Sequence, residues 1–91
     1  MEKTVSIIIK GKVQGVFFRQ STREKATTLG IKGEVKNMPD DTVQVIATGT
    51  SEQIEQLIDW CRMGPPKARV EDVIIKELPL QSFERFSIVR Y

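Results

Sequence analysis

The feature that most constrains the fold of this chain is the order in which two hydrophobic periodicities follow one another. Apolar residues that largely alternate with polar ones predict strands over residues 4–10, 31–37, 42–48 and 69–78. Apolar residues at helical spacing predict one helix after the first strand and a second helix after the third strand. Strands and helices are therefore expected in the order strand, helix, strand, strand, helix, strand.

Capping and breaking residues set the expected ends of the two helices. The first helix is predicted over residues 17–29, with Gly30 just after its last turn, where glycine is common. The second helix is expected to begin at a cap on Thr50 or Ser51 and to end at the Gly-Pro-Pro run of residues 64–66. The apolar stripe of the second helix, which is expected to face the core, consists of Ile54, Leu57, Ile58 and Cys61.

This order of elements is typical of an α+β sandwich with the ferredoxin-like βαββαβ topology, in which an antiparallel sheet carries two helices on one face. The Pro-Asp-Asp run of residues 39–41 predicts a turn that joins the second and third strands into a hairpin. Residues 83–91 are expected to add one more short strand. A chain of 91 residues is long enough for a single domain, residues 1–91, with one core.

Composition and charge argue against several classes of function. The net charge of +2 is too close to balance for the clustered basic surface of a typical nucleic-acid-binding domain. The chain has no histidine and one cysteine, Cys61, so it offers no imidazole nucleophile, no Cys-x-x-Cys metal site and no intrachain disulfide. No apolar run is long enough to cross a membrane and no signal peptide is visible, so we expect a cytoplasmic protein with neither nucleic-acid nor membrane partners.

The candidate functional segment lies between the first strand and the first helix. Residues 11–19 read GKVQGVFFR. A glycine-containing loop that enters a helix presents several backbone N–H groups without intrahelical partners, at the positive end of the helix dipole, and such a nest attracts an anion. Arg19 adds a permanently charged guanidinium suited to phosphate oxygens. Phe17 and Phe18 are both expected to belong partly to the core, so only their amides are assigned to the site.

Asn37 is the second candidate residue. It ends the predicted strand 31–37, and this strand end lies near the start of the first helix if the strand registers suit. An asparagine amide carries both a donor and an acceptor, so it can orient a water molecule without changing its charge.

These two segments resemble the signature motifs of the acylphosphatase family. Residues 11–19 are similar to the signature loop of that family, and residues 33–37, GEVKN, resemble its second motif. Chain length, element order and the final residues 86–91 match as well, so the resemblance covers the whole chain. The chain departs from the family pattern at Glu34, where an aromatic residue is frequent, and at Asp41, where glycine is frequent.

The resemblance implies a monomeric enzyme, free of metal and cofactor, that hydrolyses small-molecule acyl phosphates to a carboxylate and inorganic phosphate. It implies that the guanidinium of Arg19 binds the phosphoryl group and that Asn37 positions the attacking water. The backbone amides implied to bind phosphate are those of Gln14, Gly15, Val16, Phe17, Phe18 and Arg19.

Other interpretations of the same residues remain open from the sequence alone. The loop could bind an anion without turnover, and a ferredoxin-like domain could also bind nucleic acid, although charge and the lack of aromatic residues on the inner strands argue against it. Thr22 is expected on a helix face, and Asp40 and Asp41 are expected to be turn residues. Cys61 is expected to be a buried structural thiol.

Overall fold

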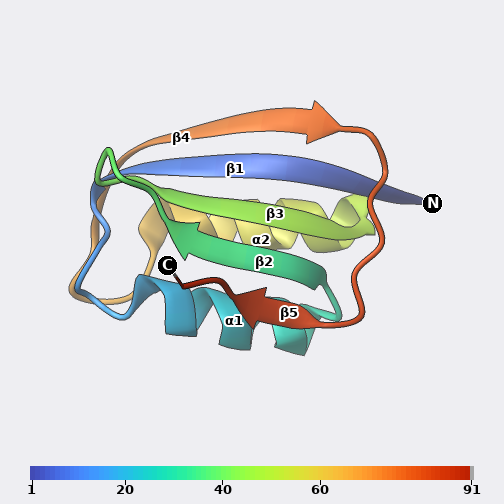
Figure 1. The fold of residues 1–91 in the computed structure, drawn as a ribbon, viewed down its shortest axis with the longest axis horizontal. Helices are drawn as coiled ribbons and strands as arrows, with labels where there is room; N and C mark the ends of the chain where they lie inside the picture. The colour runs from blue at the N-terminus through green and yellow to red at the C-terminus, as the bar shows by residue number, and fades with distance from the viewer. Residues whose placement is uncertain (91) are drawn as a thin grey trace.

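The computed structural model describes residues 1–90, which form two helices and one sheet of five strands (Figure 1). In chain order the elements are β1 (Glu2–Lys12), α1 (Phe18–Leu29), β2 (Lys32–Asn37), β3 (Val43–Thr50), α2 (Ser51–Met63), β4 (Arg69–Leu78) and β5 (Phe86–Ile88). The expected short strand over residues 83–91 is thus limited to three residues, and Tyr91 lies outside the described residues.

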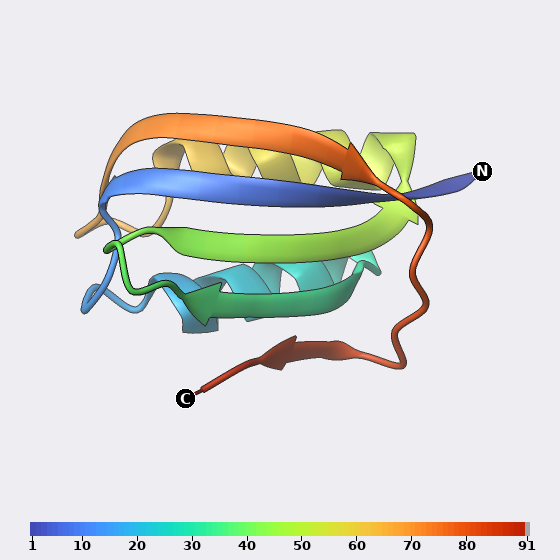
Figure 2. The same cartoon turned by 45° about the horizontal axis from the view of Figure 1, so that its top comes forward.

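The sheet has the strand order β4-β1-β3-β2-β5, and both helices cover the same face of it (Figures 1 and 2). Helix α1 packs on β2 and β5, and α2 packs on β1, β3 and β4. The predicted ferredoxin-like α+β fold is therefore confirmed. The first four strands pair antiparallel, as expected, whereas β5 pairs parallel with β2, so the complete sheet is mixed. The reason is geometric, because β4 ends at the same end of the sheet at which β2 begins. A chain that crosses directly from the end of β4 to the far edge of the sheet therefore runs beside β2 in the same direction as β2.

The core lies between the sheet and the helices, as the alternation predicts. Cross-strand pairs such as Ile7 with Val45 and Ile9 with Val43 are buried on the helix side. From α2, the buried residues are Ile54, Leu57 and Cys61. Burial also raises the pKa of the Cys61 thiol to about 12, which confirms the prediction of a buried structural thiol.

The predicted helix caps are mostly confirmed. The Thr50 hydroxyl accepts from the Gln53 amide at 3.2 Å, and the Gln53 side chain accepts from the Thr50 amide at 2.9 Å, so Thr50 rather than Ser51 is the N-cap. Gly30 ends α1 with a φ of 81°. The start of α1 was predicted one residue too early, because Phe17 has a left-handed conformation and the first helical residue is Phe18.

The first strand also extends further than the alternation indicated. After a bulge at Lys10 and Gly11, β1 continues to pair with β4 through Gly11 and Lys12. Gly11 has a φ of 126°, and a Cβ at this position would collide with the carbonyl oxygen of Arg69, so this close approach requires glycine. The connection to α1 therefore spans residues 13–17 instead of the expected 11–15.

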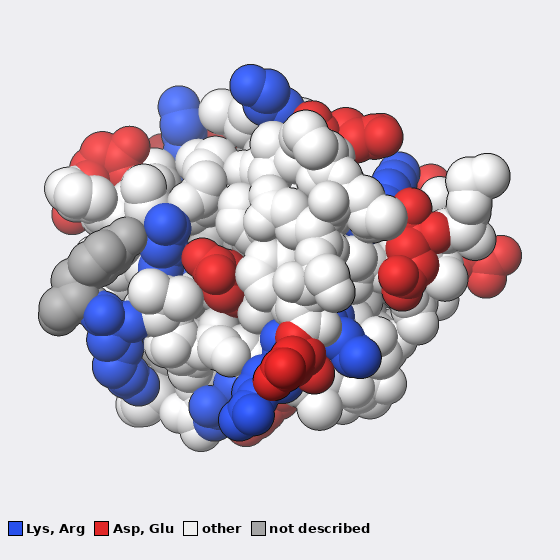
Figure 3. Space-filling model, turned by 45° about the vertical axis from the view of Figure 1, so that its right-hand side comes forward, with Lys and Arg blue, Asp and Glu red and all other residues white. Residues whose placement is uncertain are grey.

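Charged side chains of both signs are distributed over the molecular face seen in Figure 3, around a central region without charged residues. Among residues 1–90, no helix combines the length and the apolar character that a membrane crossing requires. In the same residues, no three His, Cys, Asp or Glu side chains are close enough together to hold a metal ion.

Candidate active site

The connection between β1 and α1 is anchored by three buried side chains, and the residues between them are exposed or half-buried. Val13, Val16 and Phe18 are buried, whereas Gly15 is exposed and the Phe17 side chain is 72% exposed. Gly15 and Phe17 both have left-handed φ angles, of 73° and 63°. The expectation that both phenylalanines belong to the core is thus wrong for Phe17: its left-handed backbone turns the side chain into solvent while Phe18 packs edge-to-face on Trp60, with ring centroids 5.6 Å apart.

Backbone amides at the start of α1 are left without acceptors inside the described chain. Of the backbone amides in residues 15–21, the first to donate a hydrogen bond is that of Ser21, to the carbonyl oxygen of Phe17 at 3.0 Å. Helix α1 has no side-chain cap and no acidic residue in its first turn, so no group of the helix itself neutralises this end. Unpartnered N–H groups at the positive end of a helix form an anion-binding site.

The side chain of Gln14 ties this loop to the turn between β2 and β3. Its Nε2 donates to the carbonyl oxygens of Met38 and Thr42, both at 2.9 Å. The Met38 amide also donates to the Thr42 carbonyl, at 2.8 Å, so the turn is closed at the point where Gln14 contacts it. The loop and the end of β2 are therefore held as one unit.

The turn itself is formed by the predicted residues. The carboxylate of Asp40 accepts from the hydroxyl and the amide of Thr42, at 2.6 and 3.2 Å, and these hydrogen bonds hold the pKa of Asp40 below its usual value. Asp41 has a φ of 72°, a conformation that glycine adopts more freely and that aspartate tolerates. Asp40 and Asp41 are thus turn residues, as expected. Thr22 is buried on α1 and donates to the Phe18 carbonyl at 2.7 Å, which confirms its place on a helix face.

Asn37 is the last residue of β2, where it pairs with Val43. Its Oδ1 atom is buried and has no hydrogen-bond partner among residues 1–90. A buried carbonyl oxygen without a donor costs about 1–3 kcal/mol, so such an atom is expected to be satisfied by a water molecule or a ligand.

The loop, Arg19 and Asn37 meet at one cavity of about 310 Å³. It is lined by Val13, Gly15, Phe17, Phe18, Arg19, Gln20, Asn37, Ile88 and Arg90. The structure thus places the two predicted side chains, Arg19 and Asn37, on the same cavity as the predicted amide-bearing loop. Gln14 and Val16, whose amides are also predicted to bind phosphate, are not among the residues that line this cavity.

Four residues of the cavity wall were not among the predicted site residues: Val13, Gln20, Ile88 and Arg90. Ile88 and Arg90 reach the site because β5 pairs with β2: Val35 is opposite Ile88, and the Val89 amide donates to the Val35 carbonyl at 2.9 Å. Two residues beyond this pair, Asn37 ends β2 and Arg90 follows β5, and both line the cavity. A basic residue near the end of the predicted additional strand was the available signal, but the partner of that strand could not be identified from alternation.

Comparison with known proteins agrees with the fold and identifies the family. The family model described as acylphosphatase matches residues 5–88. An acylphosphatase of Rubrobacter xylanophilus is 46% identical over 88 residues, which cover 97% of this chain and 80% of that protein. An acylphosphatase of Methylococcus capsulatus is 40% identical over 89 residues, which cover 97% of both chains.

Solved structures of acylphosphatases have the same fold. The structure of an acylphosphatase from Coxiella burnetii superimposes with a TM-score of 0.94 at 38% identity and covers 97% of this chain and 93% of that one. The acylphosphatase from Bacillus subtilis gives a TM-score of 0.93 at 33% identity, with 99% and 100% of the two chains covered. The sequence motifs, the strand order and these relatives agree, and the chain belongs to the acylphosphatase family.

Proposed function

We propose that this acylphosphatase cleaves the mixed anhydride of a carboxylic acid and phosphoric acid without a metal ion. In this proposal Arg19 and the backbone amides of residues 14–19 bind the phosphoryl group, and Asn37 positions the attacking water. The observation that carries the proposal is the shared cavity, which is lined by residues of the loop, by Arg19 and by Asn37. Among residues 1–90, the loop amides from residue 15 to residue 20 and the buried Oδ1 of Asn37 have no hydrogen-bond partner.

Binding of the phosphoryl group is supported by the donors at the cavity. Phosphoryl transfer spreads negative charge over the equatorial oxygens, and preorganised donors that face these oxygens stabilise the transition state. The backbone of the loop is held before the anion binds by its buried side chains and by the two hydrogen bonds of the Gln14 side chain, so its amides lose little conformational freedom on binding. The planar fork of Arg19 can bind two phosphoryl oxygens at once.

Positioning of the water is supported by the environment of Asn37. Its Oδ1 is an acceptor that can take one O–H of a water molecule, which leaves an oxygen lone pair free to attack phosphorus. As the P–O bond to the carboxylate breaks and the new P–O bond forms, the water gives up its proton to a phosphoryl oxygen of the substrate. Asn37 thus orients the nucleophile and does not accept a proton.

The leaving group explains why so few functional groups are sufficient. A carboxylic acid has a pKa of about 4, so the leaving group departs as the anion at neutral pH and needs no general acid. The reaction therefore depends on charge stabilisation and positioning, which amides, one guanidinium and one carboxamide can supply.

The first prediction concerns the unmodified protein. We expect it to hydrolyse benzoyl phosphate with a rate that a chelator does not change, and we expect inorganic phosphate to inhibit competitively, because phosphate would occupy the loop. Ultraviolet absorbance of the benzoyl group follows the reaction directly. A folded protein that binds phosphate but does not turn over benzoyl phosphate would instead be an anion-binding module, and loss of the rate in chelator would contradict a metal-free reaction.

The second prediction concerns the hydrogen bonds that join the loop to the turn next to Asn37. Gln14→Leu removes two hydrogen bonds of 2.9 Å and leaves the loop free to move against the turn. We expect kcat for benzoyl phosphate to fall about tenfold, because small displacements of positioning groups are costly to catalysis, and stability to fall by about 1–2 kcal/mol. Steady-state kinetics and denaturant unfolding measure the two effects.

The matched control for this substitution is Gln44→Leu. The Gln44 side chain donates a long hydrogen bond of 3.4 Å to Ser6 on the sheet face away from the helices, and it does not line the cavity. We expect its kcat to equal that of the unmodified protein. Equal losses of kcat in both variants would show that Gln14 acts only through general stability.

A further inference from the structure

A second cavity, of about 300 Å³, adjoins the one described above. It is lined by Arg19, Asn37, Val89 and Arg90. Arg19, Asn37 and Arg90 line both cavities. None of residues 13–18, which contain the loop, lines the second cavity. If the phosphoryl group lies at the loop, the part of a substrate beyond Arg19 and Asn37 enters this second cavity.

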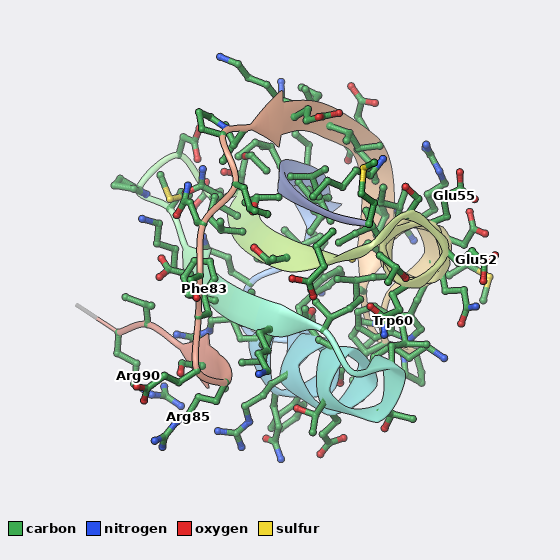
Figure 4. All side chains as sticks on the ribbon, turned by 90° about the vertical axis from the view of Figure 1, so that its right-hand side faces the viewer. Glu52, Glu55, Trp60, Phe83, Arg85 and Arg90 are labelled. Carbon is green, nitrogen blue, oxygen red and sulfur yellow. The ribbon has the colours of Figure 1, made fainter. Side chains whose placement is uncertain are left out.

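Arg90 is placed at this cavity by the strand register. The parallel pairing of β5 with β2 continues through the hydrogen bond from the Val89 amide to the Val35 carbonyl, and so brings Arg90 beside the end of β2. Figure 4 shows Arg85 and Arg90 on the C-terminal segment, before and after β5, on the side of the molecule that also carries α1. Both side chains are exposed, but only Arg90 lines the two cavities described above.

Among residues 1–90, the charged side chains that line the two cavities are all positive. The lining side chains include two guanidiniums, of Arg19 and Arg90, and no carboxylate. The proposed function uses Arg19 and the loop amides for the phosphoryl group. The charge of Arg90 is left without a role, and Arg90 lines both the loop cavity and the second cavity.

We propose that the second cavity is a subsite for the acyl part of the substrate and that Arg90 selects acyl phosphates that carry a second oxyanion, such as a carboxylate or a phosphonate, on that part. This inference rests on the proposed function, because the loop must hold the phosphoryl group for the acyl part to reach Arg90. The planar guanidinium fork matches the paired oxygens of either oxyanion. Arg90 is then a specificity-determining residue, whereas the chemical step depends on Arg19 and Asn37.

The test compares three substrates that differ only at one ring position: benzoyl phosphate, 4-carboxybenzoyl phosphate and 4-phosphonobenzoyl phosphate. The readout is the ratio of kcat/KM for each charged substrate to kcat/KM for benzoyl phosphate. We expect Arg90→Gln to lower this ratio about fivefold, the size typical of a charge pair at a solvated site. Arg90→Lys should restore part of the ratio, and high salt should reduce the ratio of the unmodified protein.

Arg85→Gln is the matched control, because it removes the same charge from the same segment at a position that lines neither cavity. Its ratios should equal those of the unmodified protein. If Arg85→Gln lowers the ratios as much as Arg90→Gln does, the effect is general electrostatics and the inference fails. If Arg90→Gln lowers kcat/KM equally for all three substrates and weakens inhibition by inorganic phosphate, Arg90 binds the phosphoryl group and the inference also fails.

Failure of the proposed function would be visible separately, as an absence of benzoyl phosphate hydrolysis by the unmodified protein. In that case the subsite is tested by calorimetry with stable analogues, benzoylphosphonate and 4-carboxybenzoylphosphonate. Tighter binding of the carboxylated analogue that is lost in Arg90→Gln supports the subsite. Equal affinities for the two analogues overturn it.

Discussion

Replacement of Arg19 by glutamine is expected to lower kcat for benzoyl phosphate, and with it kcat/KM, about a thousandfold to a hundred-thousandfold, the range seen for a guanidinium that stabilises a transferring phosphoryl group. The guanidinium lies on the cavity wall with the loop amides, at the positive end of α1. A cation is unfavourable at that end of a helix unless an anion is bound. Removal of Arg19 is therefore expected to leave the free energy of unfolding unchanged or slightly higher while the reaction is lost.

Two further variants make this result specific. Arg19→Lys keeps the charge but not the fork, so we expect it to recover only part of the activity. Arg23→Gln removes an exposed guanidinium from the same helix, one turn further on, and should leave kcat/KM unchanged. The proposal would be contradicted if Arg19→Gln retained full activity, because the reaction would then not need this guanidinium. It would also be contradicted if Arg23→Gln lost as much activity as Arg19→Gln, because the loss would then not be specific to position 19.

The local features of the fold were predictable because they depend on neighbours in the sequence. The cap at the start of α2 and the glycine at the end of α1 follow from short-range hydrogen bonding and backbone sterics. Thr50 is one of the two predicted caps, and Gly30 ends α1 as predicted. The strand β4 has the predicted bounds, Arg69–Leu78. The two adjacent phenylalanines show the limit of this reasoning, since a single left-handed residue decides which of them is buried.

The parts of the site that could not be predicted depend on strand pairing. The contact of the Gln14 side chain with the turn near Asn37 joins residues that are 24 and 28 positions apart in the sequence. The position of Arg90 depends on the parallel pairing of β5 with β2, and no local pattern specifies that partner. Motif similarity identified the residues proposed to carry the chemistry, Arg19 and Asn37, but only the sheet register shows which other side chains share their cavity.

Asn37→Ala is expected to separate binding from turnover. The substitution removes the buried Oδ1 that is proposed to hold the attacking water, so kcat for benzoyl phosphate should fall about a hundredfold to a thousandfold, as for other single groups that act in the transition state. Inhibition by inorganic phosphate should be nearly unchanged, because the loop amides and Arg19 remain. Stability should not fall, because the removed oxygen has no partner among residues 1–90.

The control for Asn37→Ala is Asp41→Gly, which alters the same turn without touching the cavity. Glycine adopts the φ of 72° at position 41 more freely than aspartate, so this variant should be at least as stable and should retain kcat. Steady-state kinetics with phosphate as inhibitor, together with denaturant unfolding, distinguishes the outcomes. If Asn37→Ala weakened phosphate inhibition as much as it lowered kcat, Asn37 would bind the phosphoryl group. If it left kcat unchanged, the water would be held elsewhere.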